Sequence, residues 1–194
     1  NLAATDQMLD SPTNNFCTIN PLDWASTSSG TFSEGNLKWD TNTNTGNGNT
    51  NYPTIKPTAG KFYYEILLKT ITLTGVSYLY IRPALDTYIW WTYAAADRDI
   101  KGSTGTTAIS VPSNGSVLQI AIDCDDGKVW YGLNGTWYTT SGTPDPAAGT
   151  GAAHIDANFT SANLQLNGRT GESVVANFGQ DSSFAGNKTS QGNA

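Results

Sequence analysis

The chain has 194 residues, which is enough for one domain, and only 13% of them are charged while 38% are hydrophobic. The formal net charge is −6, and the 10 Lys and Arg residues are scattered without a run of three. This pattern argues against nucleic acid and against an anionic membrane surface as partners. No apolar stretch approaches the ~20 residues of a membrane helix, so we also predict no membrane insertion.

Cys17 and Cys124 are the two cysteines, and His154 is the only histidine. Two cysteines are too few for a disulfide framework, and a single histidine excludes a His-rich metal site. We therefore predict no bound metal and no cofactor. The composition favours two free thiols, although sequence spacing alone leaves a bond between them open.

Strands are predicted wherever aromatic and β-branched residues alternate between turn residues, and no window shows a sustained helical stripe. The strongest strand places Phe62, Tyr64, Ile66 and Leu68 on one face. A second strand should stop at Pro83, which cannot donate a ladder hydrogen bond. The predicted stretches are residues 30–40, 60–73, 76–85, 87–93, 107–111, 117–123, 128–134, 136–140 and 173–179. Their regular spacing predicts an antiparallel sandwich or barrel.

The polar stretches between these strands are predicted loops. Residues 41–51 ("TNTNTGNGNTN") and 141–153 ("SGTPDPAAGTGAA") should be exposed and outside the core. We divide the chain into an extended N-terminal segment (1–22), a sandwich (23–180) and a polar C-terminal tail (181–194). Loops 41–52, 86–105 and 141–160 would then face a partner.

The segment "AIDCDDGKVWYGLNGTWY" (121–138) predicts a three-stranded meander. Asp126-Gly127 and Asn134-Gly135 are each expected to form a two-residue type I′ turn, because this turn needs positive φ at both positions. The acids of this segment are then turn residues. A calcium loop is the alternative, but Asp123, Asp125 and Asp126 lack the spacing of an EF-hand.

Three blocks of the sequence resemble the SPRY family: "GKFYYEILL" (60–68), "LQIAIDCDDGKVWYGLNGTW" (118–137) and "VVANFGQDSSF" (174–184). The flanks "DSPTNNFCTINPL" (10–22) and "NFGQDSSFAGNKT" (177–189) resemble segments beside SPRY-like modules of tailed-phage structural proteins. The resemblance implies an all-β fold, a two-sheet antiparallel β-sandwich of the concanavalin A-like jelly-roll type. The stretch "IWWTYAAADRDIKG" (89–102) departs from the phage-type pattern, so its loops are expected to bind something of their own.

Catalytic groupings are not recognisable. Concanavalin A-like glucanases carry an E-x-D-x-x-E strand, whereas Glu65 is followed by Ile66, Leu67 and Leu68. Glu65 is instead expected to cap a strand pairing or to meet Lys61 or Arg82. His154 is predicted to be a surface or loop histidine. Three neighbouring acids should raise the pKa of Cys124, which argues against a Cys-His nucleophile.

Aromatic residues beside a mixed-charge patch are the predicted contact site. Adjacent Trp90 and Trp91 must point to opposite faces of a strand, so one of them packs inside and the other is covered outside or exposed. Exposed Trp and Tyr are typical anchors for sugars and proteins, and nearby charges can form a polar rim. The predicted partner-binding residues are Trp90, Trp91, Tyr93, Asp97, Arg98 and Trp137.

These patterns predict a non-enzymatic binding and assembly module of a virion, such as a capsid-decoration, tail or fibre protein. Its partners would be other virion proteins or a host surface glycan or protein, with a homo-oligomer left open, and its location the virion or the extracellular space. A carbohydrate-binding lectin-like module and a cellular SPRY adaptor that binds a peptide are the alternatives.

Overall fold

The computed structural model describes residues 16–24, 30–41, 49–71, 76–82, 88–92, 98–102, 105–110, 112–156, 163–168 and 171–189. Within these ranges the chain forms strands, turns and bends but no helix. The side chains of several strands, including β6, β7 and β8, lie outside the description.

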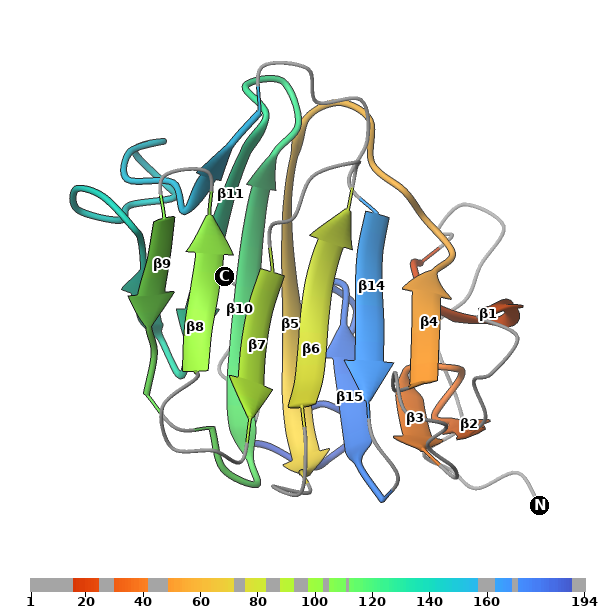
Figure 1. The fold of residues 1–194 in the computed structure, drawn as a ribbon. Helices are drawn as coiled ribbons and strands as arrows, with labels where there is room; N and C mark the ends of the chain where they lie inside the picture. The colour runs from red at the N-terminus through yellow and green to blue at the C-terminus, as the bar shows by residue number, and fades with distance from the viewer. Residues whose placement is uncertain are drawn as a thin grey trace.

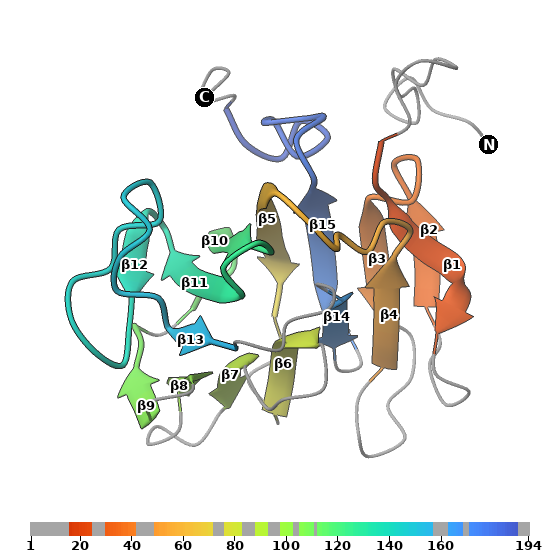
Figure 2. The ribbon, with the colours of Figure 1, turned by 90° about the horizontal axis from the view of Figure 1, so that it is seen from above.

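Two antiparallel sheets lie face to face, as Figures 1 and 2 show. The seven-stranded sheet has the order β1 (Ile19–Trp24), β4 (Asn49–Pro53), β14 (Asn163–Gly168), β6 (Val76–Arg82), β7 (Tyr88–Thr92), β8 (Arg98–Gly102) and β9 (Gly105–Ala108). The eight-stranded sheet has the order β12 (Thr136–Tyr138), β11 (Lys128–Leu133), β10 (Ser116–Asp123), β5 (Lys61–Thr70), β15 (Ser173–Asn177), β3 (Lys38–Thr41) and β2 (Gly30–Ser33), with β13 (His154–Ile155) paired to β11. This arrangement confirms the predicted all-β, two-sheet antiparallel sandwich.

The core fills the space between the sheets, because alternate residues of each strand point inward. In β5 the predicted inward set of Phe62, Tyr64, Ile66 and Leu68 all packs into this core. β10 contributes Leu118, Ile120 and Ile122 in the same way. The core also takes Leu164 and Leu166 from the facing sheet. The strand alternation read from the sequence is therefore confirmed in β5 and β10.

The two turns of the predicted meander differ from each other. Asn134 and Gly135 both have positive φ, and Leu133 pairs with Thr136, so this two-residue turn is confirmed. The other turn is not the two-residue turn that we predicted. Asp123 pairs with Lys128, the loop between them has four residues, and only Gly127 among them has positive φ.

The physical cause of the longer turn is the Asp123 carboxylate. Its Oδ1 accepts hydrogen bonds from the backbone N–H of Asp125 and of Asp126, each at 3.2 Å. Such an Asx-type contact stabilises a wider turn that begins at the aspartate itself. The acids of this segment do reverse the chain, as predicted, but Asp123 does so through its side chain.

Several strands were missed by sequence reasoning. β8 lies in the predicted loop 86–105, yet it pairs with both β7 and β9. β4 lies partly in the loop predicted for residues 41–51, and its Asn51 is fully buried. Both assignments were wrong, because pairing with two neighbouring strands overrides the weak strand propensity of charged and Asn-rich segments.

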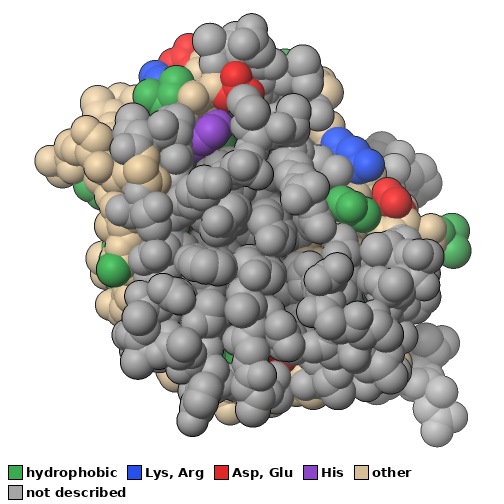
Figure 3. Space-filling view, in the orientation of Figure 1, with side chains coloured by type: hydrophobic (Ala, Val, Ile, Leu, Met, Phe, Trp, Pro, Cys, Tyr) green, Lys and Arg blue, Asp and Glu red, His purple; other side chains and the backbone are tan. Residues whose placement is uncertain are grey.

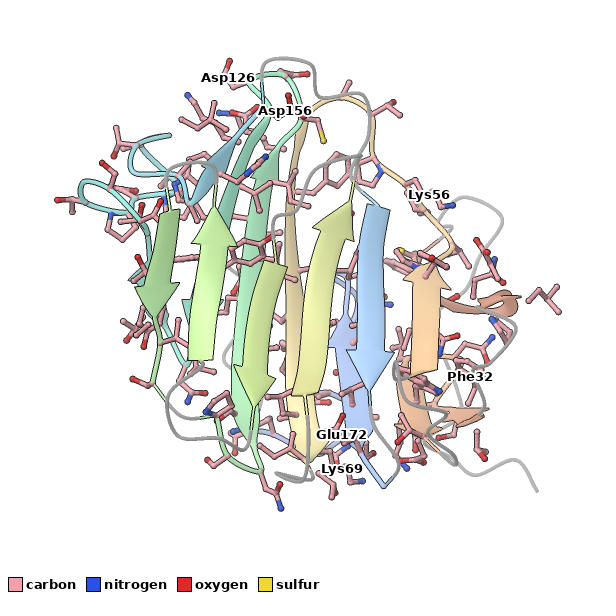
Figure 4. The ribbon with its side chains drawn as sticks, viewed as in Figure 1. Phe32, Lys56, Lys69, Asp126, Asp156 and Glu172 are labelled. Atoms are coloured by element: carbon pink, nitrogen blue, oxygen red, sulfur yellow. The ribbon has the colours of Figure 1, made fainter. Side chains whose placement is uncertain are left out.

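The ends of the predicted sandwich carry further structure. β1 crosses the predicted boundary at residue 22, and Phe184 of the predicted polar tail is buried. Figure 4 labels side chains at the two opposite ends of the sheets, with Asp126 and Asp156 at one end and Glu172 and Lys69 at the other. Among the described residues there is no helix with the length and apolar character needed to cross a membrane.

Candidate functional site

A row of residues crosses the outer face of the eight-stranded sheet, the face turned away from the other sheet. Trp137 pairs with Gly132, which also pairs with Gln119, and Gln119 pairs in turn with Glu65. Glu65 pairs with Asn177 on its other side. Because paired residues point to the same side of a sheet, these five side-chain positions share the outer face.

Tyr63 lies on the same face, two residues before Glu65 in β5. Its ring contacts the Trp137 ring edge to face, with 6.3 Å between ring centroids and 63° between ring planes. Tyr63 is 44% exposed and Trp137 is partly exposed. We call these residues the Tyr63–Trp137 face: Tyr63, Glu65, Gln119, Gly132, Trp137 and Asn177.

The absence of a side chain at Gly132 allows the Trp137 indole to lie close to strand β11. A Cβ atom at position 132 would lie 3.1 Å from Trp137 Cε3 and 3.1 Å from Gln119 Oε1. The absent side chain therefore leaves room for the indole to lie across the strand beside the Gln119 amide. Any larger residue at position 132 would displace one or both of them.

A chain of hydrogen bonds holds the polar groups of this face. The Gly135 N–H donates to Gln119 Oε1 at 2.6 Å, and Gln119 Nε2 donates to Tyr63 Oη at 2.9 Å. Tyr63 Oη donates to Glu65 Oε1 at 2.7 Å, and Asn177 Nδ2 donates to Glu65 Oε2 at 3.2 Å. Both oxygens of Glu65 are therefore oriented by neighbours on adjacent positions of the sheet.

This geometry corrects one expected partner of Glu65, Lys61, while the side chain of Arg82 lies outside the described residues. Lys61 instead lies 3.2 Å from Asp123 Oδ2, at the end of the strand. Burial, and next the hydrogen bond to Glu65, raise the pKa of Tyr63 above its ordinary value. The phenol therefore stays protonated at neutral pH and keeps donating to the carboxylate.

The outer face beside Trp137 is covered by the chain itself. Trp130, also on the outer face of β11, is buried, and its Nε1 donates to the carbonyl oxygen of Thr150 at 2.7 Å. Thr150 belongs to the predicted exposed loop 141–153, whose residues 145 and 150 bridge to each other. This loop therefore covers Trp130 while leaving Trp137 partly exposed.

On the other side, the segment that follows β15, which we call the C-terminal segment, covers an apolar patch. Leu37, Leu67 and Val175 pack with Phe184, and all four are buried. In Figure 2 the segment after β15 lies outside the eight-stranded layer, which agrees with this packing. The Tyr63–Trp137 face thus lies between two parts of the outer face that the protein covers with its own residues.

Asp181 holds the C-terminal segment in this position. Its Oδ1 accepts from the backbone N–H and the hydroxyl of Ser183, at 2.8 and 2.6 Å, and its Oδ2 accepts from the Ala185 N–H at 2.6 Å. Phe184 and Ala185 both have positive φ, a conformation that non-glycine residues rarely adopt. Burial of Phe184 and the bonds to Asp181 offset this local strain.

The structure separates the predicted contact residues. Trp90 and Trp91 pair with Asp99 and Arg98 in β7 and β8 of the seven-stranded sheet, whereas Trp137 lies in β12 of the other sheet. Tyr93 and Asp97 lie outside the described residues, as do the side chains of Trp90, Trp91 and Arg98. Figure 3 faces the seven-stranded sheet, and most of the atoms it shows belong to residues that are not described. Whether these five residues bind a partner therefore stays a prediction.

The aspartates around the 124–127 turn, which were considered as a calcium site, bond to groups of the protein itself. Asp123 accepts two backbone hydrogen bonds and faces Lys61, and Asp125 Oδ1 accepts from the Gly60 N–H at 2.9 Å. Burial acts to raise the pKa of Asp123, but hydrogen bonds from Asp126 and Lys61 outweigh it, so the pKa is lowered. In the part of the chain that the structure describes, no three His, Cys, Asp or Glu side chains group around a possible metal position.

His154 and the cysteines are also accounted for. His154 was predicted to be a surface or loop histidine, but it is buried in β13, because pairing with Val129 draws it against the sheet. Burial lowers its pKa. Both cysteines are free and buried, as the composition favoured. Burial, followed by Asp125 and Asp123, raises the pKa of Cys124 to about 11, so the thiol is a poor nucleophile at neutral pH.

Tyr63 and Gln119 are site residues that sequence reasoning missed, and Glu65 was considered there only as a catalytic acid or a structural residue. Their signal was present, because each occupies an outward position of a strand whose inward positions were assigned correctly. An aromatic, an acid and an amide at outward positions of paired strands could have been read as one surface. The strand register needed for that reading is not visible in the sequence.

Comparison with solved structures supports the fold. The SPRY domain of human HERC1 superimposes with a TM-score of 0.51 at 13% sequence identity, over 84% of this chain and 99% of that one. The TRIM65 PSpry domain gives a TM-score of 0.47 at 13% identity, over 83% and 91% of the two chains. No protein-family model matches the chain, and no curated protein matches it in sequence. The sandwich is therefore SPRY-like in fold.

Proposed function

We propose that the chain is a non-enzymatic binding module that engages a partner through the Tyr63–Trp137 face. One observation carries the proposal: the protein covers Trp130 on one side and Leu67 on the other with its own residues, yet leaves Tyr63 and Trp137 accessible between them. Exposed aromatic residues beside covered apolar ones are typical of an interaction surface.

The chemistry of the face suits binding. Tyr and Trp offer large contact areas at a low cost in conformational entropy, since each has only two side-chain torsions. The bonds from Gln119 to Tyr63 and from Tyr63 to Glu65 orient the polar groups before a partner arrives. Such preorganisation reduces the entropy lost on association.

The finer proposal is that the module belongs to a virion, as a capsid-decoration, tail or fibre protein, and is located there or outside the cell. It rests on the resemblance of residues 10–22 and 177–189 to the flanks of phage modules. A cellular adaptor that binds a peptide fits the SPRY-like fold equally well. Mass spectrometry of purified virions separates the two: the virion proposal expects this chain at a defined copy number, and its absence from the particles would contradict that proposal.

A carbohydrate-binding module is a second candidate. The observation that favours it is the partly exposed Trp137 indole, which lies beside the Gln119 amide and close to the Tyr63 ring. An aromatic ring next to fixed amide and hydroxyl groups can stack on a sugar ring and bond to its hydroxyls. A glycan array probed with the intact protein tests this candidate directly.

The binding proposal is tested with two double variants. Partner proteins and glycans are screened with the intact chain, and the affinity of each hit is measured for Tyr63→Ala/Trp137→Ala and for Trp91→Ala/Arg98→Ala. We expect the first variant to weaken binding by about tenfold or more, the effect of removing an aromatic anchor. The second reports whether the residues of β7 and β8 also contribute. Unchanged affinity in the first variant, with unchanged thermal stability, would contradict the proposal.

A further inference from the structure

We propose that the Tyr63–Trp137 face receives an arginine side chain of a protein partner, with Glu65 as its counter-charge. This inference rests on the proposed binding function and specifies the chemistry of the partner. It concerns the described residues of the face alone.

The first support is the arrangement of the two rings. Tyr63 and Trp137 meet at 63° with 6.3 Å between their centroids, so their ring planes form two sides of a corner. A guanidinium group is planar and binds over aromatic faces within about 6 Å of a ring centroid. It can therefore stack on one ring while its edge approaches the other.

The second support is the unused bonding capacity of Glu65. A carboxylate has roughly four acceptor positions, and the bonds from Tyr63 Oη and Asn177 Nδ2 use one on each oxygen. These two bonds fix the carboxylate in position next to the Tyr63 ring. A guanidinium could donate to the remaining positions in the charge-assisted geometry that arginine and carboxylates favour.

The third support is the charge of the surface. Glu65 is the one ionisable acid or base among the residues that define the face, apart from the protonated Tyr63 phenol. The chain as a whole carries a formal net charge of −6. A cation is therefore attracted, whereas a phosphate, sulfate or carboxylate group would meet Glu65 with like charge.

A purely apolar partner fits this face less well than the neighbouring patch. The apolar residues Leu67 and Val175 are already covered by Phe184. What stays accessible combines aromatic rings with a fixed carboxylate and amide. A neutral sugar could use the rings, but it would leave the charge of Glu65 without a role.

The test is a two-dimensional NMR titration that follows the side-chain N–H signals of the tryptophans, with the Trp137 signal assigned by Trp137→Phe. The probe is the peptide acetyl-Gly-Arg-Gly-amide, and its matched control carries citrulline, a neutral isostere, in place of arginine. We expect the arginine peptide to shift the Trp137 signal with a dissociation constant on the order of millimolar, and the citrulline peptide to bind about fivefold or more weakly.

Two variants show where the charge acts. Glu65→Gln keeps the shape and the acceptor for Tyr63, and we expect it to weaken the arginine peptide by about fivefold while leaving the citrulline peptide unchanged. Asp126→Asn makes the same change of net charge at an exposed turn residue that pairs with Lys128, and it should leave both peptides unaffected.

Several results would overturn the inference: equal binding of the two peptides, no shift of Trp137 with the arginine peptide, an equal effect of Asp126→Asn, or a Trp137 shift with the neutral disaccharide maltose alone. Failure here differs from failure of the proposed function. A partner whose binding requires Tyr63 and Trp137 but does not respond to Glu65→Gln or to 0.5 M salt, roughly three times physiological ionic strength, would refute the arginine and leave the binding surface in place.

Discussion

Two parts of the same sheet face behave differently in this molecule. On the outer face of the eight-stranded sheet, Leu67 and Val175 lie under Phe184 of the C-terminal segment. The Tyr63–Trp137 face, formed by neighbouring outward positions of the same sheet, is left accessible. The covered part is apolar and buried, and the accessible part combines aromatic rings with a hydrogen-bonded acid and amides. Strand alternation places both parts on one face of the sheet. The position of the C-terminal segment determines which part is buried and which part remains accessible to a partner.

The largest expected effect is on the covered part. Phe184→Ala removes the side chain that buries Leu67 and Val175, so we expect the free energy of unfolding to fall by about 3–4 kcal/mol, the usual cost of a buried Phe→Ala change. Chemical denaturation measures it. Tyr63→Ala, the matched change in the accessible part, should cost less than half as much. Equal losses would remove the distinction between the two parts.

The next effect concerns Asp181, whose hydrogen bonds fix the C-terminal segment over the sheet. Asp181→Ala removes acceptors for Ser183 and Ala185, and we expect a loss of about 2 kcal/mol in the free energy of unfolding. Burial acts to raise the pKa of Asp181, but the hydrogen bonds from Ser183 and Ala185 outweigh it and lower the pKa.

A lowered pKa in the folded state also sets the direction of the pH dependence. The stabilisation by Asp181 is fully present above the unfolded pKa of about 4 and is lost as the pH falls through the lower folded pKa. We therefore expect stability to decrease from about pH 4 downward, with a smaller decrease in Asp181→Asn. Identical stability-against-pH profiles for the original protein and for Asp181→Asn would show that this carboxylate does not stabilise the C-terminal segment.

A smaller effect on stability is expected at Gly132, where the absence of a side chain leaves room for the Trp137 indole. Gly132→Ala places a methyl group 3.1 Å from Trp137 Cε3, which should displace the indole at a cost of about 1 kcal/mol in stability. Partner affinity should fall more clearly than stability, because the indole leaves its position beside Gln119. Calorimetric titration and thermal melting compare the two, and full affinity would show that the indole position is not required.

The smallest effect isolates one hydroxyl. Tyr63→Phe keeps the ring but removes the donor to Glu65 and the acceptor for Gln119. Since both groups are partly exposed and can bond to water instead, we expect a change in stability of no more than about 1 kcal/mol. Partner affinity should fall by less than it does in Tyr63→Ala. A Phe variant as weak as the Ala variant would shift the role of this residue from ring to hydroxyl.

Much of the fold was predictable because it depends on local patterns. The inward set of β5 and the Asn134-Gly135 turn both follow from alternation and turn chemistry. β8 pairs with its neighbours along the chain, but its charged residues have little strand propensity, so it could not be predicted in this way. β4 could not be predicted because it pairs with β14, which is distant in the sequence. The burial of His154 was missed for the same reason.

The candidate site was predictable only in part. Trp137 was named from its residue type, and it lies partly exposed at an outward position, while its contact with a partner stays a prediction. Glu65 was considered, but Lys61 was a wrong partner for it and Asn177 was not foreseen, because the pairing of Asn177 with Glu65 joins residues separated by 112 positions. The cover formed by Phe184 also required the three-dimensional path of a segment that reads as a polar tail.

Hydroxyl-radical footprinting read by mass spectrometry tests the central claim most directly, because it reports the accessibility of each aromatic side chain. In the free protein we expect rapid oxidation of Tyr63 and Trp137 and protection of Phe184 and Trp130, and in a complex with a bound partner we expect Tyr63 and Trp137 to become protected as well. Oxidation of Phe184 as fast as that of Tyr63, or a partner that leaves Tyr63 and Trp137 equally reactive, would contradict the account.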